Sequence, residues 1–452
     1  MPVSPLKLPL SAPQLDFWEA ACGYAAPSTN IYAAEYIEIR GSLDRVLLER
    51  ALRQGIREAQ TLHTVRIVEV DGAPVRELDA ALADAWTLEY ADLAGEPDAH
   101  AVALADMRAH LASLTVLAHG PFFRYKLFRI APDRHYWYYG YAHILIDGYS
   151  VTLLTSRIAD IYNALTAGTE PAPVNFGTLA ELLEDERAYR SSPQYAEDRR
   201  YWLERFADQP RTVTLAGPAL LPEREGLADL RETRIVSSEE RARIEHVAKQ
   251  LFNSTVPRLF TALTAAYLFL QTGAHDIILS VAAMSRTSPR ERRTPSEMAN
   301  MLPLRLYVEP SHTLDDLCRQ AHREMGELSR HQRYRMGDLH RELTSLDNGQ
   351  GVFGPEINIM SFDFDLRFGD CTLTPHNLAV GTTDDFMVNL IDRRNGDPLR
   401  FDFDASPQYY RRDELNAHVT RFLTFMRAAL DDPFAPLGSL GALDPQSAVL
   451  AD

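Results

Sequence analysis

The sequence has few cysteines and none of the short motifs that usually bind nucleotides or catalytic zinc. Cys22, Cys318 and Cys371 are odd in number, lie far apart and form no CxxC pair, so they indicate reduced thiols rather than disulfides or a zinc site. The patterns GxxxxGK(S/T), GxGxxG and HExxH are all absent, which leaves nucleotide, dinucleotide and zinc-protease chemistry without a motif. We therefore expect no bound metal and no cofactor.

An excess of positive charge and a long apolar run are also lacking. The formal charge of −17 argues against nucleic acid or an anionic membrane as a partner, because both attract basic surfaces. The longest nearly apolar segment, Leu259 to Leu270, is too short to span a bilayer. The first residues, Met1 to Lys7, lack the regions of a signal peptide. These observations predict a soluble cytoplasmic protein.

What the chain does have is enough length for two domains. Its 452 residues exceed the size at which a single core stops growing. The Pro/Gly-rich segment from Gly168 to Pro173 is the expected boundary, with an N-terminal domain at 1–172 and a C-terminal domain at 173–432. Residues 433–452, rich in Ala, Pro, Leu and Ser, are interpreted as a linker-like tail. Strands and helices follow in a similar rhythm in both halves, which predicts two copies of one α/β fold.

Strands are predicted where β-branched and aromatic residues gather, and helices where apolar residues recur every three or four positions. In the first half this gives strands at 31–39, 64–69, 74–78, 122–130 and 135–141, and helices at 44–59, 101–117 and 151–165. In the second half it gives helices at 179–206 (broken at 191–193), 238–252, 256–272, 314–331 and 413–430, and strands at 233–237, 277–284, 302–308, 356–362, 386–392 and 399–405. The dipeptide Asp71-Gly72 marks a tight hairpin.

The stretch Tyr141 to Ser150 contains His143-x-x-x-Asp147-Gly148 between a predicted aromatic strand and a predicted amphipathic helix. A histidine at the end of a strand is well placed to act as a base. Short motifs also occur by chance, and on these residues alone a buried, hydrogen-bonded histidine is the alternative.

Several weak motifs in order along the chain resemble those of one family. These segments are Ser11 to Trp18 (SxAQxxxW-like), Glu58 to Arg66 (HExLRTxF-like), Ala142 to Gly148 (HHxxxDG without its first His), Arg330 to Tyr334 (HQxY-like) and Phe353 to Asp363 (FxPxxNxxxxD-like). The chain is thereby identified as similar to the condensation domains of nonribosomal peptide synthetases. It most resembles the opening, aryl-acid-accepting condensation domains of catecholate-siderophore synthetases.

The resemblance implies two chloramphenicol-acetyltransferase-like lobes in a V-shaped pseudo-dimer, with the active-site tunnel between them. It implies an amide-forming acyltransferase in which a carrier-bound amine attacks a carrier-bound acyl or aryl thioester. The expected partners are donor and acceptor carrier proteins, which hold the substrates on phosphopantetheine, and a following adenylation domain. His143 is the expected catalytic residue. Asp147 is expected to fix the loop by pairing with Arg286, and Gly148 to permit a tight backbone.

The sequence departs from the family's pattern at several positions. Ala142 replaces the first histidine of the motif, and His63 stands where the family commonly has an arginine. Asp384 replaces an asparagine, and an extra carboxylate there would favour an amine-bearing substrate, a solvated carboxylate being the alternative. His63, Asp384 and Asn358 are the predicted tunnel residues. Two other functions stay open. Ala142 favours a divergent or inactive domain that recruits partner enzymes, and the HxxxD pattern, shared with acyl-coenzyme A-dependent relatives, would also fit a free-standing acyltransferase that uses soluble substrates.

Overall fold

The computed structural model describes residues 5–23, 32–113, 120–216, 230–344, 354–361, 366–381, 383, 385–392 and 398–440. The chain divides into two compact units, each built from separated segments. Unit 1 comprises 1–192, 285–299 and 364–382, and unit 2 comprises 193–284, 300–363 and 383–452. The predicted boundary after residue 172 is therefore wrong: the chain first leaves unit 1 after Ser192 and later returns to it twice.

Local contacts explain why the segment after residue 172 stays with unit 1. Leu179 and Leu182 pack with Leu78 in one small apolar cluster. The backbone N–H of Leu179 also donates to Oε1 of Gln60 at 2.8 Å. Burial of these leucines ties the helix that follows the Pro/Gly-rich segment to the N-terminal unit.

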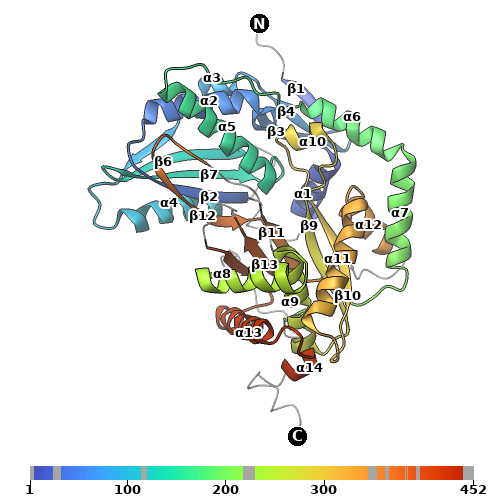
Figure 1. Ribbon diagram of the computed structural model, residues 1–452. Helices are drawn as coiled ribbons and strands as arrows, with labels where there is room; N and C mark the ends of the chain where they lie inside the picture. Colours follow the sequence, from blue (N-terminus) through green and yellow to red (C-terminus); the bar gives the residue numbers. More distant parts are fainter. Residues whose placement is uncertain are drawn as a thin grey trace. The chain divides into compact units, whose positions relative to one another are not determined.

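Unit 1 holds most of the first half of the chain (Figure 1). Its elements are β1 (Leu6–Pro9), α1 (Ala12–Gly23), β2 (Tyr32–Arg40), α2 (Arg45–Glu58), a 3₁₀ turn (Gln60–His63), β3 (Thr64–Val70), β4 (Ala73–Leu78), α3 (Leu82–Ala85), β5 (Glu89–Asp92), α4 (Ala99–Ser113), β6 (Phe123–Ala131), β7 (Arg134–Ala142), α5 (Gly148–Thr166), α6 (Leu179–Arg190), α10 (Pro289–Arg293) and β12 (Thr372–Val380). The strands form a five-stranded sheet, β12-β2-β7-β6-β5, and a three-stranded sheet, β1-β4-β3.

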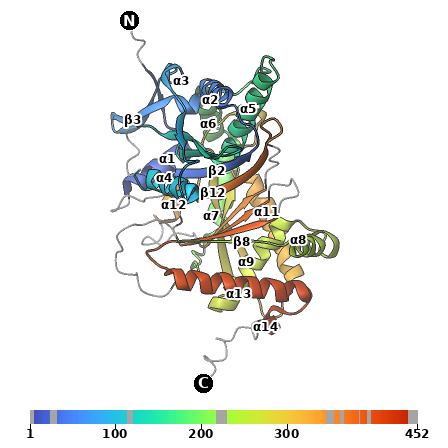
Figure 2. The same cartoon turned by 90° about the vertical axis from the view of Figure 1, so that its left-hand side faces the viewer.

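Alternation along β7 gives the five-stranded sheet two buried faces. Trp137, Tyr139 and Tyr141 point to one face and pack with apolar residues of α2 and α5. Tyr136 and Tyr138 point to the other face and pack with residues of α4. Helices α2 and α5 therefore cover one face and α4 the other, as Figures 1 and 2 both show. Strand β7, which leads to the HxxxDG loop, is fixed on both sides.

Two local features of unit 1 follow the sequence rules closely. The hairpin β3–β4 turns at Asp71 and Gly72, whose φ angles of 52° and 77° are those of a two-residue turn matched to strand twist. Helix α2 begins after Asp44, whose carboxylate accepts from the N–H groups of Val46 and Leu47. Both features confirm the predictions for 44–59 and for the Asp71-Gly72 turn.

Strand β12 was missed in the sequence. It comes from the third segment of unit 1 and pairs antiparallel with β2 along most of its length. A partner more than three hundred positions away leaves no mark in the local pattern of residues, and the strand carries Pro375 within it. An edge strand tolerates this proline because one side of its backbone makes no ladder bonds.

Unit 2 contains a six-stranded mixed sheet, β10-β9-β11-β13-β14-β8. Its elements are α7 (Pro193–Arg205), β8 (Leu230–Ile235), α8 (Ser238–Glu245), a π-helical turn (His246–Leu251), α9 (Val256–Thr272), β9 (Asp276–Ala283), β10 (Asn300–Tyr307), α11 (Leu314–Arg330), α12 (Met336–Thr344), β11 (Glu356–Met360), β13 (Phe386–Ile391), β14 (Arg400–Ala405), α13 (Arg412–Asp431) and α14 (Leu437–Leu440). The predicted mixed α/β fold class is confirmed in both units.

One face of this sheet packs against α9, α11 and α13 in a large apolar core. That core reaches Leu437, whose side chain is fully buried and whose N–H donates to the carbonyl of His312 at 2.8 Å. The interpretation of 433–452 as a linker-like tail is therefore wrong for 433–440, which pack as part of unit 2. No helix in the described part of the chain is long and apolar enough to cross a membrane.

Candidate active site

The HxxxDG loop joins β7 to α5 in a short turn. The N–H of Leu145 donates to the carbonyl of Ala142 at 2.9 Å, and the N–H of Ile146 donates to that of His143 at 3.1 Å. Asp147 then caps α5, because its Oδ1 accepts from the N–H of Ser150 at 2.8 Å. The sequence produces a strand, a tight turn and a capped helix within a few residues.

A buried ion pair fixes the start of α5. Arg286 Nη1 donates to Asp147 Oδ2 at 2.5 Å, and both side chains are almost fully buried. The second Arg286 nitrogen donates to Ser150 Oγ at 2.5 Å and to the Ser296 carbonyl at 2.9 Å. The predicted pairing of Asp147 with Arg286 is present. Because both charged groups are held by several hydrogen bonds, the pair links the loop at 285–299 to α5.

Gly148 does not have the expected conformational role. It is the first residue of α5, its φ lies outside the left-handed region, and a Cβ added to it would meet no atom within 4 Å. The prediction that Gly148 permits a tight backbone is wrong, because its backbone is one that residues with a side chain also adopt.

His143 is held by a carboxylate and an aromatic ring. Its Nδ1 lies 2.8 Å from Glu297 Oε2; the His143 side chain is 14% exposed and that of Glu297 is fully buried. The Phe17 ring stacks on the imidazole with centroids 4.7 Å apart and an angle of 19° between the planes. Since a carboxylate can only accept, Nδ1 carries a proton and donates. Nε2 has no hydrogen-bond partner among the described residues.

The backbone of Gly381 also approaches the imidazole. Gly381 has φ of +101°, and a Cβ at this position would lie 3.2 Å from His143 Cδ2 and 3.7 Å from Nε2. Here a glycine is needed on both counts, since other residues rarely adopt this φ and a side chain would crowd the ring. Unit 1 thus brings its three chain segments together around one imidazole.

The charges around His143 favour its protonated form. Burial lowers the pKa of the imidazole, but the hydrogen-bonded Glu297 carboxylate and the charge of Asp147 together outweigh burial and raise the pKa above its ordinary value. An imidazole that binds a proton more tightly is a stronger base.

The opening motif supports the same loop. Gln14 Nε2 donates to the carbonyl of Ile144 at 2.8 Å. The backbone N–H and hydroxyl of Ser11, the residue before α1, both donate to Gln14 Oε1 at 3.1 and 3.0 Å. Thr61 Oγ1 donates to the carbonyl of Leu145 at 2.8 Å. Residues from the first two motifs therefore hold the backbone that follows His143.

The predicted tunnel residues are not brought together by the described contacts. His63 is buried in the turn after α2, where its Nε2 donates to the carbonyl of Ile56 at 2.9 Å and burial lowers the pKa of its ring. We correct its assignment to support of that turn. Asn358 lies in unit 2, where its Nδ2 donates to Asn389 Oδ1 at 3.0 Å. Its proposed contact with substrate stays a prediction, and Asp384 lies outside the described residues.

Sequence reasoning missed Glu297, Phe17 and Gly381. Phe17 lies inside a motif that was recognised, but nothing in its spacing relates it to His143. Glu297 comes shortly after the basic loop at 285–295 and lies 154 positions after His143 in the sequence. Only the fold joins these positions.

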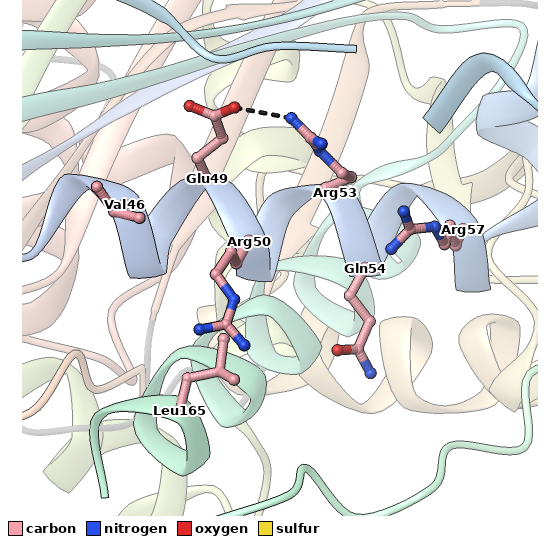
Figure 3. Close-up of a pocket in the computed structure, with 7 residues that line it drawn as sticks. All are labelled: Val46, Glu49, Arg50, Arg53, Gln54, Arg57 and Leu165. Carbon is pink, nitrogen blue, oxygen red and sulfur yellow. Dashed lines mark hydrogen bonds and ion pairs between the residues drawn. The ribbon is translucent and has the colours of Figure 1, made fainter. Parts of the chain in front are cut away.

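Unit 1 also has an open groove of about 420 Å³ on the outer side of α2. Figure 3 shows the arginine side chains extending from this helix. The lining residues are Val46, Glu49, Arg50, Arg53, Gln54, Arg57 and Leu165. The groove contains none of the residues around His143. No group of three or more His, Cys, Asp or Glu side chains in the described chain is placed to hold a metal ion.

Comparison with known proteins agrees with this arrangement. Residues 7–449 match the family model of the condensation domain. The isonitrile lipopeptide synthase of Streptomyces coeruleorubidus is 38% identical over 433 residues, covering 96% of this chain and 29% of that protein. Component F of the enterobactin synthase of Escherichia coli (strain K12) is 30% identical over 440 residues, covering 97% of this chain and 33% of that protein.

The fold has a close match among solved structures. The starter condensation domain of a variant of the rhizomide synthetase RzmA, in complex with C8-CoA, superposes with a TM-score of 0.87 at 35% identity, covering 96% of this chain and 97% of that one. The chain spans a third or less of the length of the curated relatives named above. It belongs to the condensation-domain family of nonribosomal peptide synthetases, acyltransferases that form amide bonds.

Proposed function

We propose that this domain condenses an acyl thioester held on a donor carrier protein with the amine of an aminoacyl group held on an acceptor carrier protein. The observation that carries the proposal is the imidazole of His143, fixed by Glu297 and Phe17 on the HxxxDG loop with Nε2 unbonded within the described residues. An oriented base of this kind suits proton transfer from an attacking amine.

The reaction needs no covalent enzyme intermediate. The amine nitrogen attacks the thioester carbonyl carbon, and the new C–N bond forms as its proton passes to His143 Nε2. The tetrahedral intermediate then expels the phosphopantetheine thiolate, the C–S bond breaks, and the imidazolium returns the proton to sulfur. Atoms and charges balance without a metal, an oxidant or a soluble cofactor. The raised pKa of His143 supports the first of these proton transfers.

The donor is proposed to be a starter acid, aryl or linear. The aryl class follows from the predicted resemblance to catecholate-siderophore synthetases, and the likeness to enterobactin synthase component F supports a relation to siderophore synthetases. The relatives whose names refer to a lipopeptide and to a complex with C8-CoA support a linear acyl class. A following adenylation domain stays part of the proposal, because the chain corresponds to only part of its multidomain relatives.

Mass spectrometry of reactions with loaded carrier proteins tests the proposal. Carriers loaded with an aryl acid or with octanoate are each paired with aminoacyl carriers, and octanoyl-coenzyme A is tried as a soluble donor. We expect an amide from a carrier-bound donor and none with His143→Ala. If no pair yields an amide, the condensation reading fails and the recruiting role suggested by Ala142 replaces it. If the soluble donor reacts as fast as the carrier-bound one, the free-standing acyltransferase replaces it.

A further inference from the structure

Glu297 has no role in the family motifs that identify the chain, yet it makes the closest polar contact of the His143 ring. Its side chain is fully buried. A buried carboxylate loses its hydration and needs compensation from hydrogen bonds or charges. In this structure the hydrogen bond from His143 Nδ1 supplies part of it. A buried carboxylate such as Glu297, placed beside a candidate base such as His143, suggests a role in the chemistry of that base.

The neighbours of Glu297 on both sides hold it in place. The N–H of Ser296 donates to Ser150 Oγ at 3.1 Å, and the Ser296 carbonyl accepts from that same hydroxyl at 2.8 Å. On the other side, the N–H of Met298 donates to Asp147 Oδ2 at 3.0 Å. The backbone around Glu297 is therefore fastened to the first turn of α5, which directly follows the His143 loop. Its carboxylate is presented to the imidazole by a rigid support.

Ala142 explains why such support is needed. In the motif that the chain resembles, this position carries the first of two histidines, whereas the Ala142 methyl is fully buried and offers no hydrogen bond. Only the backbone of Ala142 is polar, and its N–H donates to the carbonyl of Phe122 at 2.7 Å. The residue next to His143 cannot orient the imidazole through its side chain, so orientation has to come from another part of the chain.

We propose that Glu297 is the positioning residue of this domain: it fixes the tautomer of His143 with the proton on Nδ1 and stabilises the imidazolium formed during catalysis. The inference rests on the proposed function and assigns a residue to it that the motif does not contain. With Nδ1 donating to Glu297, the lone pair of Nε2 faces the reacting amine. An ionised carboxylate at this position interacts most strongly with the imidazole once the imidazole has taken up a proton.

The groups that face His143 set the expected pH dependence. The loop at 285–299 contributes Glu297, and the start of α5 contributes Asp147, which is paired with Arg286. From α1 the facing residue is the uncharged Phe17, and from the third segment it is Gly381. Removal of the Glu297 charge takes away the principal group that raises the pKa of His143, while burial, which lowers it, remains. The acid limb of the rate profile then moves to lower pH.

The test compares Glu297→Gln with Glu297→Asp and with a control, Glu291→Gln. Glu291 lies in the same loop and is also buried, but its carboxylate accepts from the N–H groups of Thr287 and Ser288 instead of from His143. Single-turnover amide formation is measured against pH, and folding is followed by circular dichroism. For Glu297→Gln we expect the rate to fall by about 10-fold to 100-fold, the range typical of losing the partner that orients a metal-bound histidine.

The acid limb is expected to shift to lower pH in Glu297→Gln, to return part of the way in Glu297→Asp, and to stay in place in Glu291→Gln. A folded Glu297→Gln variant with the rate and pH profile of the parent overturns the inference while leaving the proposed function intact. Full activity of His143→Ala overturns the proposed function itself. If Glu297→Gln does not fold, the ¹⁵N spectrum of His143 in the parent decides: a proton on Nδ1 supports the inference, and a neutral ring protonated on Nε2 contradicts it.

Discussion

Each unit contains a histidine whose Nδ1 bonds a buried carboxylate and whose ring stacks on an aromatic side chain. In unit 1 these residues are His143, Glu297 and Phe17. In unit 2 they are His331, Asp198 and Tyr201, with Nδ1 2.7 Å from Asp198 Oδ1 and ring centroids 4.0 Å apart. The two sets share nearly the same local geometry, but only one lies on the HxxxDG loop.

The backbone around each histidine is different. His331 directly follows α11. Its backbone N–H donates to the carbonyls of Glu327 and Leu328 in the last turn of the helix, and its own carbonyl accepts from the Trp202 indole N–H at 3.0 Å. Asp198 Oδ1 also accepts from Gln194 Nε2 at 2.7 Å. Asp198, Tyr201 and Trp202 all belong to α7, so these three contacts of His331 fasten the end of α11 to α7.

His143 is instead held from three separate chain segments, and its ring contacts one helix, α1, through Phe17. A histidine–carboxylate pair with an aromatic neighbour is thus not evidence of catalysis by itself. What distinguishes the two is whether the contacts of the histidine connect helices or orient the ring. The substitutions below separate these two roles.

The largest effect is expected from His143→Ala. Loss of a general base typically lowers a rate by about 10²- to 10⁴-fold. Because the His143 ring joins no pair of helices, the melting temperature is expected to change little. Amide formation and thermal unfolding measured on the same preparation check both statements. If the variant loses its fold together with its activity, His143 has a structural role like that of His331.

Arg286→Met is expected to have the largest effect on stability. It leaves Asp147 buried without its cation, and removing one partner of a buried ion pair costs about 3–5 kcal/mol. Urea unfolding measures the loss. The double variant Arg286→Met with Asp147→Asn is expected to recover part of it, because the uncompensated charge is gone. Equal losses in the single and the double variant would contradict the ion-pair explanation.

His331→Ala is expected to reverse the pattern seen for His143. It leaves Asp198 without one of its hydrogen bonds and opens the stack on Tyr201, for a loss of about 1–3 kcal/mol. Amide formation by the fraction that remains folded is expected to keep the pH profile of the parent. A shifted pH profile would show that the second histidine also takes part in the chemistry.

The smallest effect is expected in the pH dependence of stability. The folded-state pKa of His143 is raised, so its protonation stabilises the fold below the unfolded-state pKa, and this contribution is lost as pH rises through the folded-state pKa. The difference in unfolding free energy between the parent and His143→Gln is therefore expected to shrink with rising pH. A difference that grows with pH would mean that the neutral ring is the favoured form.

Local patterns predicted what depends on neighbouring residues. The Asp71-Gly72 turn, the capped start of α2 and the break between α6 and α7 at Ser191 to Pro193 all follow from turn and helix-end chemistry. The pairing of Asp147 with Arg286 was reached through the family resemblance, since nothing in the spacing of the two residues indicates it.

Features that depend on distant residues were missed. The Pro/Gly-rich stretch at 168–173 looks like a domain boundary, but burial of Leu179 and Leu182 keeps the next helix in unit 1. Strand β12 is recognisable only from its pairing with β2. Glu297 looks like one acid after a basic loop, and its burial against His143 comes from backbone bonds to α5. Sequence spacing carries no information on such contacts.

The order of the three segments of unit 1 has a consequence for synthesis. His143 leaves the ribosome first, Glu297 follows within the second segment, and Gly381 arrives at the end of the third. At about 5–20 residues per second, the delay between His143 and Gly381 is roughly 10 to 50 seconds. During this interval the edge of β2 that later receives β12 has not yet met its partner strand. The nascent unit therefore carries an unpaired strand edge, open to wrong strand pairing, until its active site is complete.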